Sequence, residues 1–129
     1  CLGCIAQRLN RSFLFDPETM MLVGWKNNVT GEVILSEDSL TEDKCLAFPF
    51  SGIHIMSDKV FGLMDMYVED KGLDVDMQAG VRFPIVDFYL WAMKKAPIYG
   101  ALSDDLKMLD VGKMDSLKQA EDMLRSLNL

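Results

Sequence analysis

Asp110 is the residue whose setting in the sequence most suggests chemistry. It lies near the end of the run Lys107–Gly112, which predicts a strand followed by a glycine turn and a helix. Ligands of open α/β sheets collect beyond the carboxyl ends of strands, and a carboxylate among apolar neighbours is costly to bury unless a cation meets it. Mg²⁺ fits such a position, because it takes one or two protein carboxylates and fills its shell with water and phosphate oxygens. The alternative is that Asp110 is a cap or a surface acid.

Two further patterns resemble metal sites but have simpler explanations. The CxxC at 1–4 leaves only Cys45 and His54 to complete the four nitrogen or sulfur ligands of a zinc site. We therefore interpret the cysteines as small buried residues in a reducing cytoplasm, and His54 as a histidine satisfied within a strand. The DxD at 74–76 lies in a polar stretch and is interpreted as a solvated acidic loop.

Composition narrows the class of protein. The 129 residues suffice for one domain, and half of them are apolar. A net charge of −7, without a cluster of Lys or Arg, argues against a nucleic-acid surface, although a small anion needs only one or two local cations. Neither a signal peptide nor an apolar stretch of about 20 residues is seen, so we expect a cytoplasmic protein that does not span a membrane. The apolar opening Cys1–Ala6, without an initiator Met, suggests a fragment.

The first third of the chain predicts β-structure. Short β-rich runs alternate with Pro, Asn and Gly, a pattern that is typical of hairpins. The expected strands are Cys1–Gln7, Phe13–Phe15, Met20–Trp25 and Val33–Leu35, followed by a loop over Ser36–Lys44.

A longer strand, Leu46–Met56, is expected next, with Gly52 marking either a bulge or a close approach of a ligand. Ser57 then predicts the N-cap of a helix through Tyr67. Its buried face is expected to carry Val60, Phe61 and Met64. We interpret Val68–Arg82 as a mobile insertion.

The remainder alternates between helix and strand. Pro84 suits the first position of a helix over Ile85–Lys95, which is apolar nearly all round and should pack on a sheet. A short strand is expected over Ile98–Ala101. Asp115 predicts the cap of a final helix whose apolar stripe is Leu117, Ala120, Leu124 and Leu127. Together these elements predict an α/β fold with a hairpin region near its start.

Four segments, taken in order, resemble those of one known family. They are Arg11–Asp16 with Val23–Asn27 and Thr30–Glu32, Leu46–Phe48 with Phe50–His54, Pro84–Leu90 with Pro97–Gly100, and Leu109–Leu117 followed by Ala120 and Glu121. The last three resemble an F-S/T-G-I strand, an I-x-D-F/L-Y-L helix and a W-x-D-x-G-T-x-x-x-L-x-x-A ending. The family is that of bacterial sugar-1-phosphate nucleotidyltransferases, such as mannose-1-phosphate guanylyltransferases and N-acetylmuramate-1-phosphate uridylyltransferases.

This resemblance implies that residues 1–129 form a single domain, the carboxy-terminal portion of a Rossmann-like α/β/α sandwich. That portion is the sugar-phosphate-binding half. The nucleotide-binding half, with its G-x-G-T-R-L loop and first metal aspartate, is absent from the sequence. The implied reaction is attack of a sugar 1-phosphate oxygen on the α-phosphorus of a nucleoside triphosphate, which releases pyrophosphate. Mg²⁺ would screen the two anions, and positioning would replace a protein nucleophile.

The same resemblance implies roles for particular residues. Asp110 corresponds to the second metal aspartate. Gly52 would let the sugar approach the backbone. Lys26 would contact the sugar phosphate, although its Gly-Trp-Lys-Asn setting departs from the family's E-K-P. Trp25 would cover a sugar face or fill the hairpin, and Asp87 would position the sugar or organise the start of its helix.

The isolated chain is expected to be inactive and to self-associate through exposed sheet edge and apolar surface. The alternative function is a non-catalytic module, derived from the same fold, that binds a sugar phosphate or a protein. The sequence identifies neither the sugar nor the nucleotide.

Overall fold

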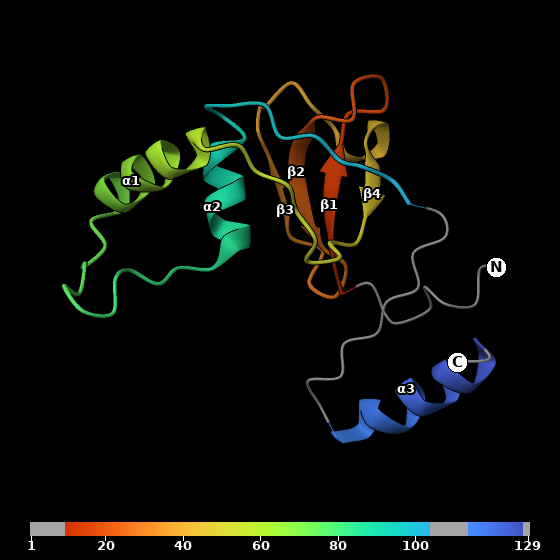
Figure 1. Ribbon diagram of the computed structural model, residues 1–129. Helices are drawn as coiled ribbons and strands as arrows, with labels where there is room; N and C mark the ends of the chain where they lie inside the picture. Colours follow the sequence, from red (N-terminus) through yellow and green to blue (C-terminus); the bar gives the residue numbers. More distant parts are fainter. Residues whose placement is uncertain (1–9, 104–113, 128–129) are drawn as a thin grey trace. The chain divides into compact units, whose positions relative to one another are not determined.

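The computed structural model describes residues 10–103 and 114–127 (Figure 1). The chain divides into two compact units. The described part of the larger unit is residues 10–101, and the smaller unit contains the carboxy-terminal helix. The expectation of a single domain stays a prediction.

The larger unit is built on a four-stranded sheet with the order β3-β2-β1-β4. All three strand pairs are antiparallel. The strands are β1 (Arg11–Phe15), β2 (Leu22–Asn27), β3 (Val33–Leu35) and β4 (Leu46–Phe48). The expectation of a mixed α/β fold with hairpins near its start is therefore confirmed. A Rossmann-like sandwich, whose sheet is mostly parallel, stays a prediction.

The first hairpin turns where the sequence predicts it. The Asp16 carboxylate accepts hydrogen bonds from the backbone N–H groups of Glu18 and Thr19, at 2.8 and 2.9 Å. These bonds hold the turn between β1 and β2, and they lower the pKa of Asp16 because they favour its charged form.

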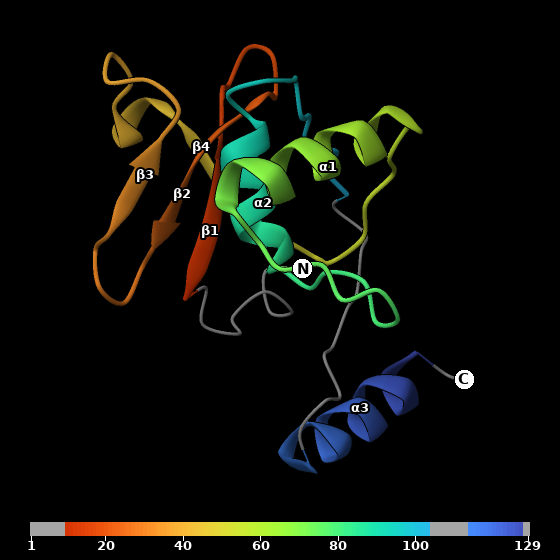
Figure 2. The same ribbon diagram turned by 90° about the vertical axis from the view of Figure 1, so that its left-hand side faces the viewer.

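Two helices lie on one side of the sheet. Figures 1 and 2 show α2 (Ile85–Ala92) between the sheet and α1 (Lys59–Lys71). Strands and helices share one core, whose buried members are Phe13, Leu22, Tyr67, Phe88, Tyr89, Ala92 and Met93. The prediction that the apolar helix after Pro84 packs on a sheet is confirmed, although the helix ends at Ala92 and the next three residues form a turn. Pro84 is its N-cap rather than its first residue.

The prediction of a strand through Met56 is wrong beyond Phe48, because β4 has only three residues and 49–57 form neither strand nor helix. The helix that follows begins at Lys59 rather than after Ser57. It continues past Tyr67 to Lys71 and ends at Gly72 in the left-handed conformation. Phe61, expected on its buried face, is 68% exposed.

Other expectations are met in part. The run Ile98–Ala101 makes a bridge between Tyr99 and Met21 rather than a full strand. Within Val68–Arg82, the first residues belong to α1 and Asp76–Gly80 close a turn. The strands predicted over residues 1–7 and 107–112 lie outside the described residues.

The helix of the smaller unit, α3, spans Met114–Ser126. Asp115, predicted as its cap, therefore lies inside the helix. Glu121 and Arg125 form an ion pair one turn apart. None of the helices in the described part of the chain combines the length and apolar character needed to cross a bilayer.

Candidate functional site

Trp25 and Lys26, both predicted to contact a sugar phosphate, point to opposite faces of the sheet. They are neighbours on β2, and successive strand residues alternate between faces. Trp25 is paired with Phe13 and packs against the core. Lys26 is paired with Ser12 and therefore lies on the face away from that core. The structure does not bring these two side chains together.

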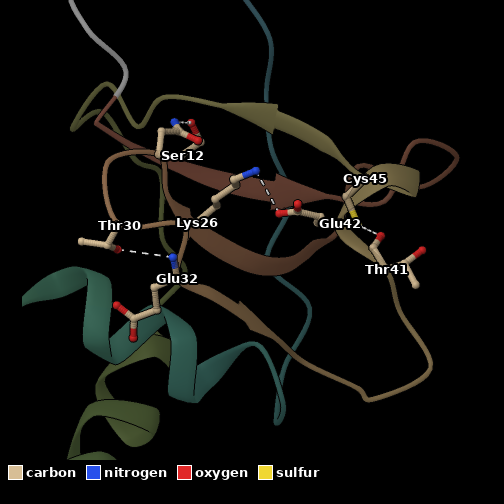
Figure 3. Close-up of polar contacts among 8 residues, drawn as sticks. Ser12, Lys26, Thr30, Glu32, Thr41, Glu42 and Cys45 are labelled. Carbon is tan, nitrogen blue, oxygen red and sulfur yellow. Dashed lines mark hydrogen bonds and ion pairs between the residues drawn. The ribbon is translucent and has the colours of Figure 1, made fainter.

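Lys26 already has an anionic partner. Its Nζ lies 3.0 Å from Oε2 of Glu42 (Figure 3), which belongs to the 3₁₀-helix η2 (Glu42–Lys44). The two side chains are 30% and 43% exposed, so the pair is accessible to solvent. A phosphate at Lys26 would have to compete with this carboxylate.

Two other polar contacts hold the region around Lys26. The side-chain amide of Asn28 donates to the hydroxyl of Ser12 at 3.1 Å, and Ser12 is only 3% exposed. The thiol of Cys45 donates to the carbonyl oxygen of Thr41 at 3.4 Å (Figure 3). Burial and then the negative charges of Asp16 and Asp43 raise the pKa of that thiol. Cys45 is therefore a poor nucleophile at neutral pH.

Gly52 lies in the irregular segment after β4, not within a strand. Its φ of 81° is in the left-handed region, which side chains rarely adopt. A Cβ added at Gly52 would meet no heavy atom within 4 Å. The glycine is thus required by its backbone conformation, and a close approach of a sugar to its open backbone stays a prediction.

The segment around Gly52 is attached to the core by aromatic rings. The ring of Phe50 contacts Phe13 at 5.4 Å and Tyr89 at 6.0 Å between centroids. The imidazole of His54 stacks on Phe50 at 6.0 Å and contacts Tyr89 at 6.2 Å. His54 is therefore an exposed residue of an irregular segment, held by rings rather than satisfied within a strand.

Asp87, the candidate residue on α2, lines an open depression of about 460 Å³ between α1 and α2. The depression is lined by Tyr67, Lys71, Asp87, Leu90, Trp91 and Lys94. Burial raises the pKa of Tyr67, and the negative charge of Asp87 raises it further. Asp87 and Lys26 are thus separated by the sheet, because α2 covers the face opposite Lys26.

The magnesium prediction rests on Asp110, which lies outside the described residues. Within residues 10–103 and 114–127, no three His, Cys, Asp or Glu side chains are grouped as a metal site. The carboxylate of Asp76, in the DxD, accepts hydrogen bonds from the backbone of Gln78 and Ala79, both at 2.7 Å. These bonds lower the pKa of Asp76. They explain this acid as part of a turn, in agreement with the acidic-loop interpretation.

Sequence reasoning missed the lysines around Asp87. Lys94 lies seven residues after Asp87, and Leu90 and Trp91 lie between them at helical spacing. That spacing was visible in the sequence. The contribution of Tyr67 and Lys71 from α1 was not, because it depends on how the two helices pack.

Comparison of the chain with protein-family models, with curated proteins and with solved structures found no match.

Proposed function

We propose that this chain is the sugar-phosphate-binding part of a sugar-1-phosphate nucleotidyltransferase. The full reaction would join a nucleoside triphosphate to a sugar 1-phosphate and release pyrophosphate. The resemblance of four segments, in order, to that family is the basis of the proposal.

One observation about the described residues supports it: three of the four segments converge in space. Phe13 comes from the hairpin, Phe50 and His54 from the Phe-Ser-Gly-Ile segment, and Tyr89 from α2. Their rings form one cluster, with centroids between 5.4 and 6.2 Å apart. Segments that resemble one family and also pack together are expected if they shape a common site. This cluster lies on the core face of the sheet, so it joins the segment of Gly52 to α2 but does not include Lys26 on the opposite face.

Within this proposal the side chains have separate roles. Mg²⁺, held in part by Asp110, would supply charge screening for two reacting anions. Lys26 would release Glu42 and bind the phosphate group of the sugar phosphate in its place. The open backbone at Gly52 would border the sugar, and Trp25 would support the hairpin from the core side, since it faces away from Lys26.

The proposal also concerns the fold. In a Rossmann-like sandwich, further parallel strands would have to join the chain beyond the described antiparallel sheet. The side chains of Ile53 and Ile55, which are 62% and 101% exposed, would then be apolar surface for the other half of the protein to cover.

The test uses the longest protein encoded in the same reading frame. Pyrophosphate release is measured with Mg²⁺, each of the four common nucleoside triphosphates and a set of hexose 1-phosphates. We expect release with at least one pair. We expect Asp110→Asn to reduce kcat by about a hundredfold or more, because charge stabilisation at the transition state is typically worth that much.

Asp115→Asn is the matched control, since it makes the same change five residues later. It should leave kcat within about twofold, whereas equal loss in both variants would indicate a general structural effect. Absence of pyrophosphate release with every pair would contradict the enzyme proposal. Sugar-phosphate binding without turnover would instead favour the non-catalytic module.

A further inference from the structure

The depression between α1 and α2 combines cationic, anionic and aromatic side chains, of which Asp87 alone was a candidate for the proposed reaction. It is lined by Asp87, Leu90 and Trp91, which share one face of α2, and by Lys94 from the turn that follows this helix. Tyr67 and Lys71, one turn apart, line it from α1. Its volume is about 460 Å³, and it is open to solvent.

The two lysines of this depression have no ion pair among the described residues. The ion pairs found there involve Lys26 with Glu42 and Arg125 with Glu121. Lys71 and Lys94 both line this depression, and neither is paired with a carboxylate of the described residues. An anion bound between them would gain two charged donors without displacing a protein carboxylate from either.

The aromatic wall of the depression is held in place. The indole N–H of Trp91 donates to the Asp70 carboxylate at 2.7 Å, and the ring packs edge-on against Tyr67 with centroids 5.4 Å apart. Nζ of Lys95 lies 4.9 Å from the centroid of the Trp91 ring. Because these contacts fix the indole before a ligand arrives, binding would cost little side-chain entropy there.

Asp87 narrows the ligand class. A carboxylate beside two lysines disfavours a bare anion but accepts hydrogen bonds from hydroxyl groups. A molecule with a phosphate at one end and hydroxyls on a ring offers a partner to the lysines, to Asp87 and to the aromatic ring of Trp91. We propose that this depression binds a small phosphorylated sugar, with the phosphate between Lys71 and Lys94, a hydroxyl donating to Asp87, and the ring against Leu90 and Trp91.

This site goes beyond the proposed function, because it lies on the other side of the sheet from Lys26 and needs no metal ion. Binding at this depression requires only the 129-residue chain and no other part of a longer protein. A phosphorylated sugar bound here would report on the supply of substrate or product without taking part in the reaction.

The test is a titration of the 129-residue chain with glucose 1-phosphate, inorganic phosphate and glucose, followed by ¹H–¹⁵N NMR. We expect the indole N–H signal of Trp91 and the amides of Lys71 and Lys94 to shift most with glucose 1-phosphate. The double variant K71E/K94E should raise the Kd at least about tenfold, since it removes two charged hydrogen bonds. The matched control K44E/K118E makes the same change of charge at two exposed lysines and should leave the Kd unchanged.

Asp87→Ala distinguishes a sugar phosphate from a simple anion. This variant should raise the Kd for glucose 1-phosphate, because the acceptor for a sugar hydroxyl is lost. It should leave the Kd for inorganic phosphate unchanged or lower it, because a repulsive carboxylate is lost. The proposal is overturned if these signals do not shift, if K44E/K118E weakens binding as much as K71E/K94E, or if inorganic phosphate binds wild type as tightly as glucose 1-phosphate. Asp110→Asn should leave the titration unchanged, so this site and the proposed reaction can fail separately.

Discussion

Nζ of Lys26 and Oε2 of Glu42 lie 3.0 Å apart and join the middle of the sheet to the 3₁₀-helix before β4. Because both side chains are partly exposed, the pair should contribute less than about 1 kcal/mol to stability. Glu42→Gln should therefore change the free energy of unfolding, measured in urea, by no more than that amount.

The same variant tests the role proposed for Lys26. With its competitor neutral, Lys26 should bind phosphate more readily, so Glu42→Gln should lower the Kd for a sugar 1-phosphate in the longest protein of the reading frame. Lys26→Met should raise it. If Glu42→Gln and Lys26→Met have equal Kd values for the sugar 1-phosphate, Lys26 does not bind its phosphate.

Phe88 and Phe61 provide a comparison between a buried and an exposed ring. Phe88 is 1% exposed within the core, whereas Phe61 is 68% exposed on α1. Phe88→Ala should lower the free energy of unfolding by about 3–5 kcal/mol, because it loses burial and leaves a cavity. Phe61→Ala should cost less than about 1 kcal/mol. Chemical denaturation of the two variants measures the difference, and similar losses would mean that Phe61 is covered in solution.

Gly24 and Gly62 should respond to alanine in opposite directions. A Cβ at Gly24 would clash with the backbone carbonyl oxygen of Ile34 and lie 2.9 Å from Leu35 Cδ2, so the strands must separate. Gly24→Ala should therefore lower the melting temperature. A Cβ at Gly62, inside α1, would meet no heavy atom within 4 Å. Gly62→Ala should stabilise the protein by about 0.5–1 kcal/mol, because alanine favours helix. Equal shifts in both variants, measured by thermal unfolding, would contradict this account.

Asp16 should make stability depend on pH. Backbone hydrogen bonds from Thr19 and Glu18 lower its pKa in the folded chain. A lowered pKa stabilises the fold above the unfolded value of about 4, and this contribution is lost as the pH falls through the folded value. Asp16→Ala should therefore be less stable than wild type at pH 7, with a smaller difference near pH 2.5. Urea titrations at both pH values measure it. Asp38→Ala is the control, because Asp38 is exposed in the loop between β3 and β4. Its stability difference from wild type should change less between the two pH values.

Local patterns in the sequence predicted the first three strands of the sheet well. The runs at 13–15, 20–25 and 33–35 carry β-rich residues, and the turns between them carry their own side-chain acceptors, such as Asp16. Short-range chemistry is sufficient there, because each strand pairs with its neighbour in sequence.

Prediction failed where a partner element decides the outcome. Ile53 and Ile55 have the alternation of a strand, but β4 ends at Phe48 and their side chains are exposed. Phe61 has the right spacing for a buried helical face, but α1 packs mainly through Tyr67. The sequence analysis did not group Asp87 with Lys94, although their spacing allows it, and the contribution of Lys71 depends on tertiary packing that no local pattern encodes.

The position of β4 beside β1 has a consequence for the order of folding. The hairpins β1–β2 and β2–β3 close short loops, but Phe13–Phe15 must meet Leu46–Phe48 across the whole of the intervening chain. Because closing a longer loop costs more entropy, we expect the three-stranded meander to form early and β4 to dock late. Substitutions on β2 should then slow refolding, while substitutions on β4 should chiefly accelerate unfolding.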